Sequence, residues 1–385
     1  MIVKNAIGTT IPVAISDPIN QKILSVSEDL LSGFQTDPFG EISRLTEIPV
    51  DIVIDRVKAM LASGTIRRVR QTMITTSLAR GSLVAWQLEE SKLNDAFDYM
   101  FQEDPFSGHV VIRTADVGSA GERYRLWTTL KVPPQFSLEK HADFLAEKVG
   151  AQSYRLMPAK KLFALGVGHT RRKQILPGSR SEDPGRVIDT EIIPLTSEQW
   201  KIMEVLKREF AVSELVQDLW QQRADEIGIT LQELYDTADE LEAKGLIGRF
   251  STFLEHVKPT ADGERVTRYN ALFHWAVPEG MELQAGQELG RHHIMTHAYW
   301  REGGPEFQNV NVMGVVHGTD KQLILDHKKA IDNHLNELNI PVSYTNVFWG
   351  GRSEIKPSEI SPLAYQQWCE SNGIDLGDMT AGGNL

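Results

Sequence analysis

Apolar positions recur at helical spacing in some segments and alternate with polar positions in others, and the two patterns follow a regular order. Val53, Val57 and Leu61 have helical spacing, and Gly64 is placed to end that helix as a C-terminal cap. Residues 1–24 are expected to be an irregular arm. Three short helices and a strand are predicted next, in the outline of a winged helix-turn-helix, at 26–34, 41–48, 49–63 and 66–76.

A different alternation follows, in which strands and helices are mixed. The predicted elements are strand 82–88, helix 92–102, strands 109–117 and 124–132, helix 137–150 and strand 154–165. The order βαββαβ is that of a ferredoxin-like domain. Glycine, proline and basic residues then predict a linker over 166–193.

The same pattern then begins again. Thr196 and Gln199 have the spacing of a capping box before an apolar-periodic helix. The predicted helices and wing are 196–210, an added helix 212–227, 230–244 and 246–254. The second βαββαβ set is predicted at 269–277, 281–291, 294–302, 310–317, 320–338 and 342–349, before a partly helical tail with a disordered glycine-rich end.

The two halves align in sequence as well as in pattern. Residues 60–68 match 241–249, and the segment from His109 to Arg113 matches that from His297 to Arg301. Two matches in the same order indicate an internal duplication. We therefore predict an α+β fold, a tandem repeat whose two sheets face each other as a pseudo-dimer. The expected domains are an arm 1–24, winged helices 25–80 and 194–256, ferredoxin-like domains 81–165 and 257–349, a linker 166–193 and a tail 350–385.

Composition limits the functions that this chain can have. Its 385 residues suffice for roughly two to four domains. A formal net charge of −12 disfavours non-specific nucleic-acid binding, which requires a basic surface. The single cysteine, Cys369, allows neither an internal disulfide nor a cysteine-based zinc site within one chain. No signal peptide or membrane span is evident, so we expect a cytoplasmic location.

The segment 294–302 carries the most suggestive chemistry. If it is a strand, His297, Tyr299 and Arg301 point to one side, because side chains alternate between the faces of a strand. An imidazole, a phenol and a guanidinium in a row can ligate a metal, donate a proton or clamp a carboxylate. The wet face of an edge strand can carry the same residues without any function, so the row alone leaves the role open.

The duplicated unit resembles the Lrp/AsnC family of transcription regulators. In the siroheme decarboxylases that branch from this family, one strand carries a His-Asn-Tyr-x-Arg-like motif, and a strand with an Asn-Leu-Trp-like core follows. Here the second half has His-x-Tyr-x-Arg-Glu from His297 to Glu302, and the first half has Trp127 in the following strand. Val111 replaces the tyrosine in the first half, and 309–313 lacks the tryptophan in the second. The chain resembles a fused pair of such subunits.

The resemblance implies an enzyme that removes acetate carboxyls from an iron tetrapyrrole without oxidation, in haem d1 or alternative haem biosynthesis. It implies that His297 is proton donor or iron ligand, Tyr299 a partner donor and Arg301 a carboxylate clamp. His109 and Arg113 would have the same parts in a more degenerate first half. Expected substrate-binding residues are Arg113, Arg123, Arg125, Trp127, Arg291 and His293. The expected apolar floor comprises Trp127, Trp275, Trp300 and Phe273, and His292 and His293 are expected to cap a helix as cations.

Two other functions remain open at this stage. A tetrapyrrole-binding protein without catalysis has the same sequence requirements as the enzyme. A DNA-binding regulator is favoured by the helix-turn-helix outline but disfavoured by the acidic helix 230–244. No cofactor is expected beyond the iron of the tetrapyrrole. The expected partners are the tetrapyrrole, and a second copy or related pathway proteins; neither membrane nor DNA is expected.

Overall fold

The structure is a computed structural model that describes residues 2–4, 10–165, 175–255 and 268–381. The chain divides into two compact units, and each unit combines segments from both halves. Unit 1 contains 2–4, 10–74 and 193–255, and unit 2 contains 75–165, 175–192 and 268–381. Corresponding segments of the duplication therefore come together in space, instead of each half folding by itself.

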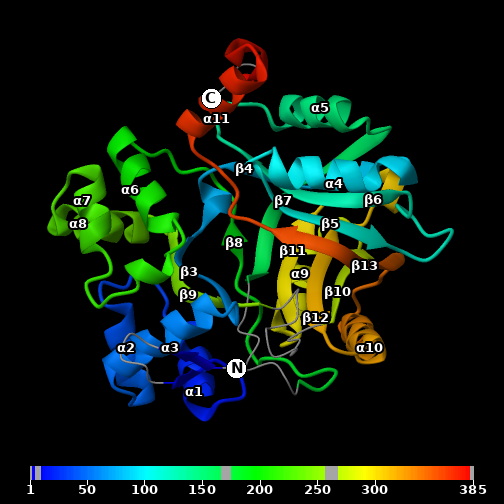
Figure 1. Ribbon diagram of the computed structural model, residues 1–385. Coiled ribbons are helices and arrows are strands. Elements are labelled where there is room, and N and C mark those ends of the chain that lie inside the picture. Colours follow the sequence, from blue (N-terminus) through cyan, green and yellow to red (C-terminus); the bar gives the residue numbers. More distant parts are fainter. Residues whose placement is uncertain (1, 5–9, 166–174, 256–267, 382–385) are drawn as a thin grey trace. The chain divides into compact units, whose positions relative to one another are not determined.

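Unit 2 contains two βαββαβ sets, labelled in Figure 1. The first is β4 (Arg80–Gln87), α4 (Leu93–Gln102), β5 (Ser107–Thr114), β6 (Tyr124–Val132), α5 (Leu138–Val149) and β7 (Ser153–Leu165). The second is β10 (Tyr269–Ala276), α9 (Glu282–Arg291), β11 (Met295–Arg301), β12 (Val312–Gly318), α10 (Lys321–Glu337) and β13 (Tyr344–Ile355). Both sets have the strand order 4-1-3-2 of a ferredoxin-like sheet, since β7-β4-β6-β5 and β13-β10-β12-β11 are neighbours. The predicted order of elements is confirmed.

The two sheets do not remain separate, as we had expected from sequence. Strand β13 pairs with β5, and β11 pairs with β7, both antiparallel, so eight strands close into a barrel. A short strand β8 (Ile188–Asp189), inside the predicted linker, adds to β7. The expectation of two sheets that only face each other is wrong, because each exposed edge finds a hydrogen-bonding partner in the other half. Residues 166–174 of that linker lie outside the described residues.

Helices cover the outer face of the barrel and side chains fill its inside. Outer apolar cores lie under α4 and α5 in the first half and under α9 and α10 in the second. A third cluster comes from alternate positions of the strands, including Trp127, Met157, Met313 and Phe348. Alternation along each strand thus assigns one set of residues to the helices and the other to the barrel interior.

The C-terminal segment is part of unit 2, and not a loose tail. Strand β13 continues to Ile355, and helix α11 (Pro362–Asn372) follows. Tyr365 and Trp368 of α11 enter the outer core beside α5. The buried Tyr365 hydroxyl lies 3.0 Å from Nδ1 of His141, whose Nε2 lies 3.4 Å from Oδ1 of Asp104. The glycine-rich end at 382–385, predicted to be disordered, lies outside the described residues.

Unit 1 contains two sets of three helices, each followed by a strand. The first is α1 (Pro18–Ser27), α2 (Pro38–Thr46), α3 (Val50–Ala62) and β3 (Ile66–Met73). The second is α6 (Ser197–Lys207), α7 (Gln221–Ile227), α8 (Leu231–Ala243) and β9 (Ile247–Leu254). Strands β3 and β9 pair antiparallel across the duplication. The predicted capping box at Thr196 and Gln199 is present at the start of α6.

The N-terminal residues correct the prediction of an irregular arm. Helix α1 lies at 18–27, and not at 26–34, because Asp17 accepts hydrogen bonds from the first turn and Pro18 occupies the first helical position. Proline there lacks only an N–H that would have no helical partner, so it favours a helix start. Strands β1 (Ile2–Lys4) and β2 (Thr10–Pro12) precede this helix.

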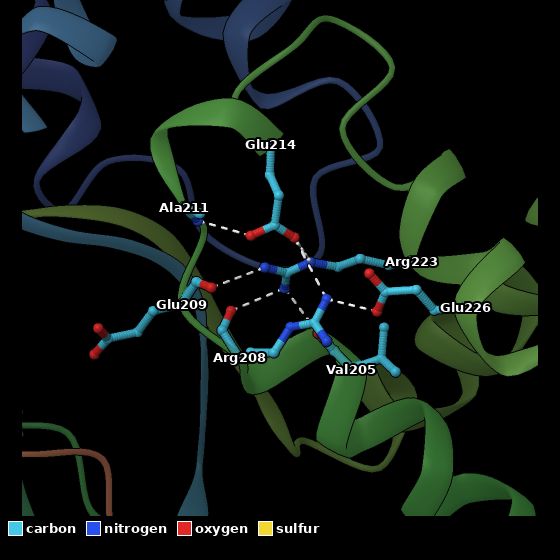
Figure 2. Close-up of polar contacts among 7 residues, drawn as sticks. All are labelled: Val205, Arg208, Glu209, Ala211, Glu214, Arg223 and Glu226. Atoms are coloured by element: carbon cyan, nitrogen blue, oxygen red, sulfur yellow. Dashed lines mark hydrogen bonds and ion pairs between the residues drawn. The ribbon is translucent and has the colours of Figure 1, made fainter. Parts of the chain in front are cut away.

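The added segment of the second half is organised by one buried arginine, shown in Figure 2. The segment 212–227 is not one helix, as predicted, but a 3-10 helix at Val212–Glu214 followed by α7. Arg223 of α7 is fully buried and donates to the backbone oxygens of Val205, Arg208 and Glu209 at 2.8, 2.8 and 3.0 Å. A cation is favourable there because the C-terminal carbonyls of α6 have no helical partners.

Candidate functional site

The predicted row on β11 faces the inside of the barrel. Ala298 of this strand lies in the outer core and Trp300 packs against that core, so the alternate residues His297, Tyr299 and Arg301 turn inward. The rings of His297 and Tyr299 are stacked, with centroids 6.1 Å apart and an interplanar angle of 8°. The Arg301 guanidinium lies over the Tyr299 ring at 4.4 Å. The three side chains therefore form one continuous surface.

Burial governs the electrostatics of this row. Burial raises the pKa of Tyr299, although the neighbouring Arg301 opposes that shift. Burial also lowers the pKa of Arg301, whose side chain is only 8% exposed and donates to the backbone oxygen of Met157. Among the described residues, no carboxylate forms an ion pair with Arg301, and its Nε has no hydrogen-bond partner. A buried guanidinium without a carboxylate is well suited to bind one from a ligand.

Arg113 of β5 holds the equivalent place in the first half. It is 3% exposed, and its Nη1 donates to Phe348 O at 3.4 Å and to Oδ1 of Asn270 at 2.8 Å. Phe348 corresponds to Met157 in the duplication, since each is the residue of the fourth strand that pairs with the same position of the first strand. Each arginine thus binds the equivalent carbonyl of the other half. Burial lowers the pKa of Arg113 to about 9.

His109 lies on the same strand as Arg113 but has a different neighbourhood from His297. Its Nε2 is 2.8 Å from the hydroxyl of Ser353 on β13, across the junction between the two halves. Val111, a member of the interior cluster, holds the position that Tyr299 holds in the second half. The first half therefore lacks the phenol that stacks on the histidine in the second half.

The interior cluster includes one of the four residues expected to form an apolar floor. Trp127 is fully buried beside Phe307 and Phe348, with ring centroids at 5.6 and 5.0 Å. Phe307 comes from the loop between β11 and β12. The other three expected floor residues, Phe273, Trp275 and Trp300, lie on the opposite face of the sheet with the helices.

Four expected substrate-binding residues are not brought to the interior. Arg125 donates to Glu90 at the entrance to α4, and Arg123 is exposed in the loop before β6. Arg291 pairs with Glu288 at the end of α9, and the exposed His293 contacts Ser179. These side chains lie near the candidate strands in sequence, but they point to the outer face or the surface.

His292 is a cap of α9, but the prediction that it is a cation is wrong. It is buried, and burial together with His334 and neighbouring arginines lowers the pKa of His292 to about 3. Its Nε2 lies 2.8 Å from Nδ1 of His334. The neutral ring therefore serves a hydrogen bond, and not a charge interaction with the helix end.

Three interior residues were not expected from sequence. His274 of β10 is 1% exposed, and burial and the nearby Arg113 lower its pKa to about 3. Asn270 of the same strand bridges Arg113 to Nε2 of His317, at 2.8 and 2.9 Å. Alternation along β10 could have assigned Asn270 and His274 to one face, but only pairing of β10 with β13 and β12 brings that face to Arg113.

The described residues offer no metal centre and no membrane segment. Within residues 2–4, 10–165, 175–255 and 268–381, no group of three or more His, Cys, Asp or Glu residues could hold a metal ion. No helix in that same part of the chain is long and apolar enough to cross a membrane. The inner face of the barrel is thus a surface of buried cations, imidazoles and aromatic rings.

Known proteins support the predicted resemblance. Residues 78–164 match the family of AsnC-like ligand binding domains. The chain is similar to the crystal structure of the siroheme decarboxylase NirDL, with a TM-score of 0.64 and 19% identity over 92% of this chain and 98% of that one. The same protein in co-complex with an iron-uroporphyrin III analogue gives 0.63 and 19% over 91% and 99%. No curated protein matches by sequence. The resemblance to an AsnC-like, siroheme decarboxylase-like fold is confirmed.

Proposed function

We propose that unit 2 binds an iron tetrapyrrole, most simply siroheme, and removes acetate carboxyls from it without oxidation. The observation that carries this proposal is the pair of buried arginines, Arg113 and Arg301, at equivalent positions inside the barrel. Neither forms an ion pair with a carboxylate of the described chain. Burying a charge without a partner is costly, so these positions favour a ligand that supplies carboxylates.

The similar fold of NirDL makes a tetrapyrrole the first ligand to test, because that protein is a siroheme decarboxylase and is seen with an iron-uroporphyrin III analogue. A tetrapyrrole with several carboxylates around an aromatic macrocycle matches cations set among aromatic side chains. Trp127, Phe307 and Phe348 supply those rings on the inner face. Planar apolar contact would hold the macrocycle while the arginines fix its carboxylates.

The reaction requires the bond between an acetate methylene and its carboxylate to break. Carbon dioxide leaves, the electron pair remains on the methylene carbon, and a proton added there gives a methyl group. We assign the carboxylate to Arg301, and the proton or an iron contact to His297, with Tyr299 as the second donor. Arg113 and His109 occupy the corresponding positions in the first half, where Val111 replaces the phenol. No oxidant or added cofactor is needed to balance this step.

Unit 1 is proposed to be a tandem pair of winged helix-turn-helix domains that serves in folding and association, and not in DNA binding. Helix α3 offers two basic residues, Arg56 and Lys58, and Arg56 is bound to Asp17 at 2.8 Å. Helix α8 has five acidic residues in thirteen and no basic one. An acidic helix such as α8 repels phosphates. A cytoplasmic location and association with a second copy or with related proteins stay predictions.

Anaerobic incubation of the purified chain with siroheme, followed by mass analysis, tests the function. Successive losses of carbon dioxide are the expected result. Arg301→Ala should weaken siroheme binding by roughly thirtyfold or more, because the ligand carboxylate loses its partner. Arg352→Ala is the matched control, since Arg352 lies on β13 but is paired with Asp98. Its affinity should equal that of the wild type.

His297→Ala separates the two roles of this residue. If His297 supplies the proton, turnover should fall roughly a hundredfold while binding remains; if it contacts iron, the visible spectrum should change. Binding without mass loss would leave a tetrapyrrole-binding protein without catalysis. If the chain neither binds siroheme nor removes carbon dioxide from it, both the decarboxylase and the tetrapyrrole-binding protein are excluded. Salt-dependent nanomolar binding to duplex DNA would then establish the regulator.

A further inference from the structure

Buried histidines in the described chain differ in how their ring nitrogens are used. His141, His292 and His334 each have a partner, in Tyr365 or in one another. Nε2 of His274 and Nε2 of His327 are buried and have no hydrogen-bond partner among the described residues. His327 lies on α10, on the outer face, whereas His274 faces the barrel interior. An unsatisfied buried nitrogen costs free energy unless a ligand completes it.

His274 lies beside Arg113, which also has a buried nitrogen without a hydrogen-bond partner among the described residues. Both adjoin Phe348: the His274 ring is 5.0 Å from the Phe348 ring, and Arg113 donates to the Phe348 carbonyl. Nε of Arg113 is also buried without a partner among the described residues. Two donor groups, both more than nine-tenths buried, thus lie on one wall of the interior with unused hydrogen-bonding capacity.

We infer that Arg113 and His274 together form a carboxylate-binding site on the inner face of the barrel, in addition to the row on β11. The inference rests on the proposed function, and its ligand is one of the carboxylates on the edge of the tetrapyrrole. The guanidinium supplies charge and the imidazole supplies a further N–H. The site anchors a carboxylate that does not react.

Charge decides between a carboxylate and a metal at this site. Arg113 remains a cation at neutral pH, since its pKa is about 9, and it would repel an iron ion brought to His274. A carboxylate stabilises both groups and raises the pKa of His274 from about 3 toward its ordinary range. Arg113 is the charged group that lowers the pKa of His274.

The other buried arginine, Arg301, has no counterpart of His274 beside it in the described part of the chain. Ala85 precedes Trp86 on β4 as His274 precedes Trp275 on β10, so alanine stands at the equivalent position. Arg301 has Tyr299 as its neighbour instead. The two buried arginines therefore have different work: Arg113 anchors with His274, and Arg301 acts beside Tyr299 and His297.

The test uses two probes on the full chain, acetate and metal-free uroporphyrin III. NMR titration of the His274 ring, assigned from the spectrum of His274→Gln, should show its pKa rise in acetate but not in sodium chloride of equal ionic strength. His274→Gln should weaken uroporphyrin III binding roughly tenfold or more, because Arg113 alone then holds the carboxylate. His327→Gln removes a buried imidazole outside the barrel whose Nε2 likewise has no hydrogen-bond partner among the described residues, and it should bind as the wild type does.

The outcomes separate this inference from the proposed function. Uroporphyrin III binding that is unchanged in His274→Gln, with no acetate response, overturns the inference and leaves the function standing. An acetate response without porphyrin binding supports the carboxylate site and rejects the function. Equal losses of uroporphyrin III affinity in His274→Gln and His327→Gln would indicate general destabilisation. If, in addition, acetate does not change the pKa of the wild-type His274 ring, the inference is overturned.

Discussion

Arg223 in Figure 2 gives a sharp test of how unit 1 is held together. Its guanidinium is fully buried, lies 3.5 Å from the centroid of the Phe210 ring, and donates to three backbone oxygens. Its Nε also lies 3.2 Å from Oε1 of Glu214. Burial lowers the pKa of Arg223 to about 10, so it stays charged at neutral pH.

Arg223→Met keeps most of the side-chain length but removes the four polar contacts, to three backbone oxygens and to Glu214. The variant leaves the Glu214 carboxylate without this cation and leaves C-terminal carbonyls of α6 without donors. Breaking a buried ion pair costs about 3–5 kcal/mol, and methionine packing on Phe210 and Trp220 recovers only part of that. We expect the free energy of unfolding to fall by about 3–4 kcal/mol, a large fraction of the 5–15 kcal/mol typical of domains.

Urea denaturation followed by circular dichroism measures the loss, and hydrogen exchange of peptides from 197–227 locates it. The control is Arg208→Met, because Arg208 is 46% exposed and pairs with Glu214 and Glu226 at the surface. That change should cost less than about 1 kcal/mol. An Arg223→Met protein with the same denaturation midpoint and the same exchange of α6 as the wild type would refute the reasoning.

Two further predictions concern unit 2. His274 and His292 have pKa values of about 3 in the folded chain against an ordinary 6.5. Between pH 6.5 and pH 3, only the unfolded chain binds a proton at each of these histidines. The free energy of unfolding should therefore fall as the pH drops from about 6.5 toward 3, by up to about 1.4 kcal/mol per pH unit for each histidine. Urea denaturation at several pH values measures this, and His→Gln variants that keep the wild-type slope would contradict it. Tyr365→Phe leaves Nδ1 of buried His141 without its partner and should cost about 1–3 kcal/mol. Leu363→Ala on the same helix, 62% exposed, should change stability by less than about 0.5 kcal/mol, and equal effects of both would reject a role for that hydrogen bond.

The sequence alone was sufficient for most elements and for the duplication. Strand β6 lies at the predicted residues, 124–132, because alternation and flanking turns define it locally. Gly150 and Gly245 have positive φ after helices α5 and α8, where a C-terminal cap favours glycine. The common face of His297, Tyr299 and Arg301 followed from strand alternation. These features depend on short-range geometry, which neighbouring residues encode.

Other features depended on which segments meet in space. The closure of the barrel is decided by edge strands from opposite halves, and alternation within a strand cannot show which edge a strand will pair with. Arg125 and Arg113 lie one strand apart in sequence, yet one reaches Glu90 outside the barrel and the other is buried inside. The sequence likewise could not show that α11 completes an outer core.

The chemistry of the site shows the same division. The sequence shows two arginines at matching positions of a duplication, but the tertiary structure decides which groups surround them. Each becomes a buried cation only because the fourth strand of the other half covers it and offers a carbonyl, from Phe348 to Arg113 and from Met157 to Arg301. The protonation state of His274 is also decided by the tertiary structure, because burial by strands distant in sequence and the nearby Arg113 lower its pKa. Residue identity and local periodicity are encoded along the chain, whereas burial and electrostatic coupling arise from contacts between residues far apart in it.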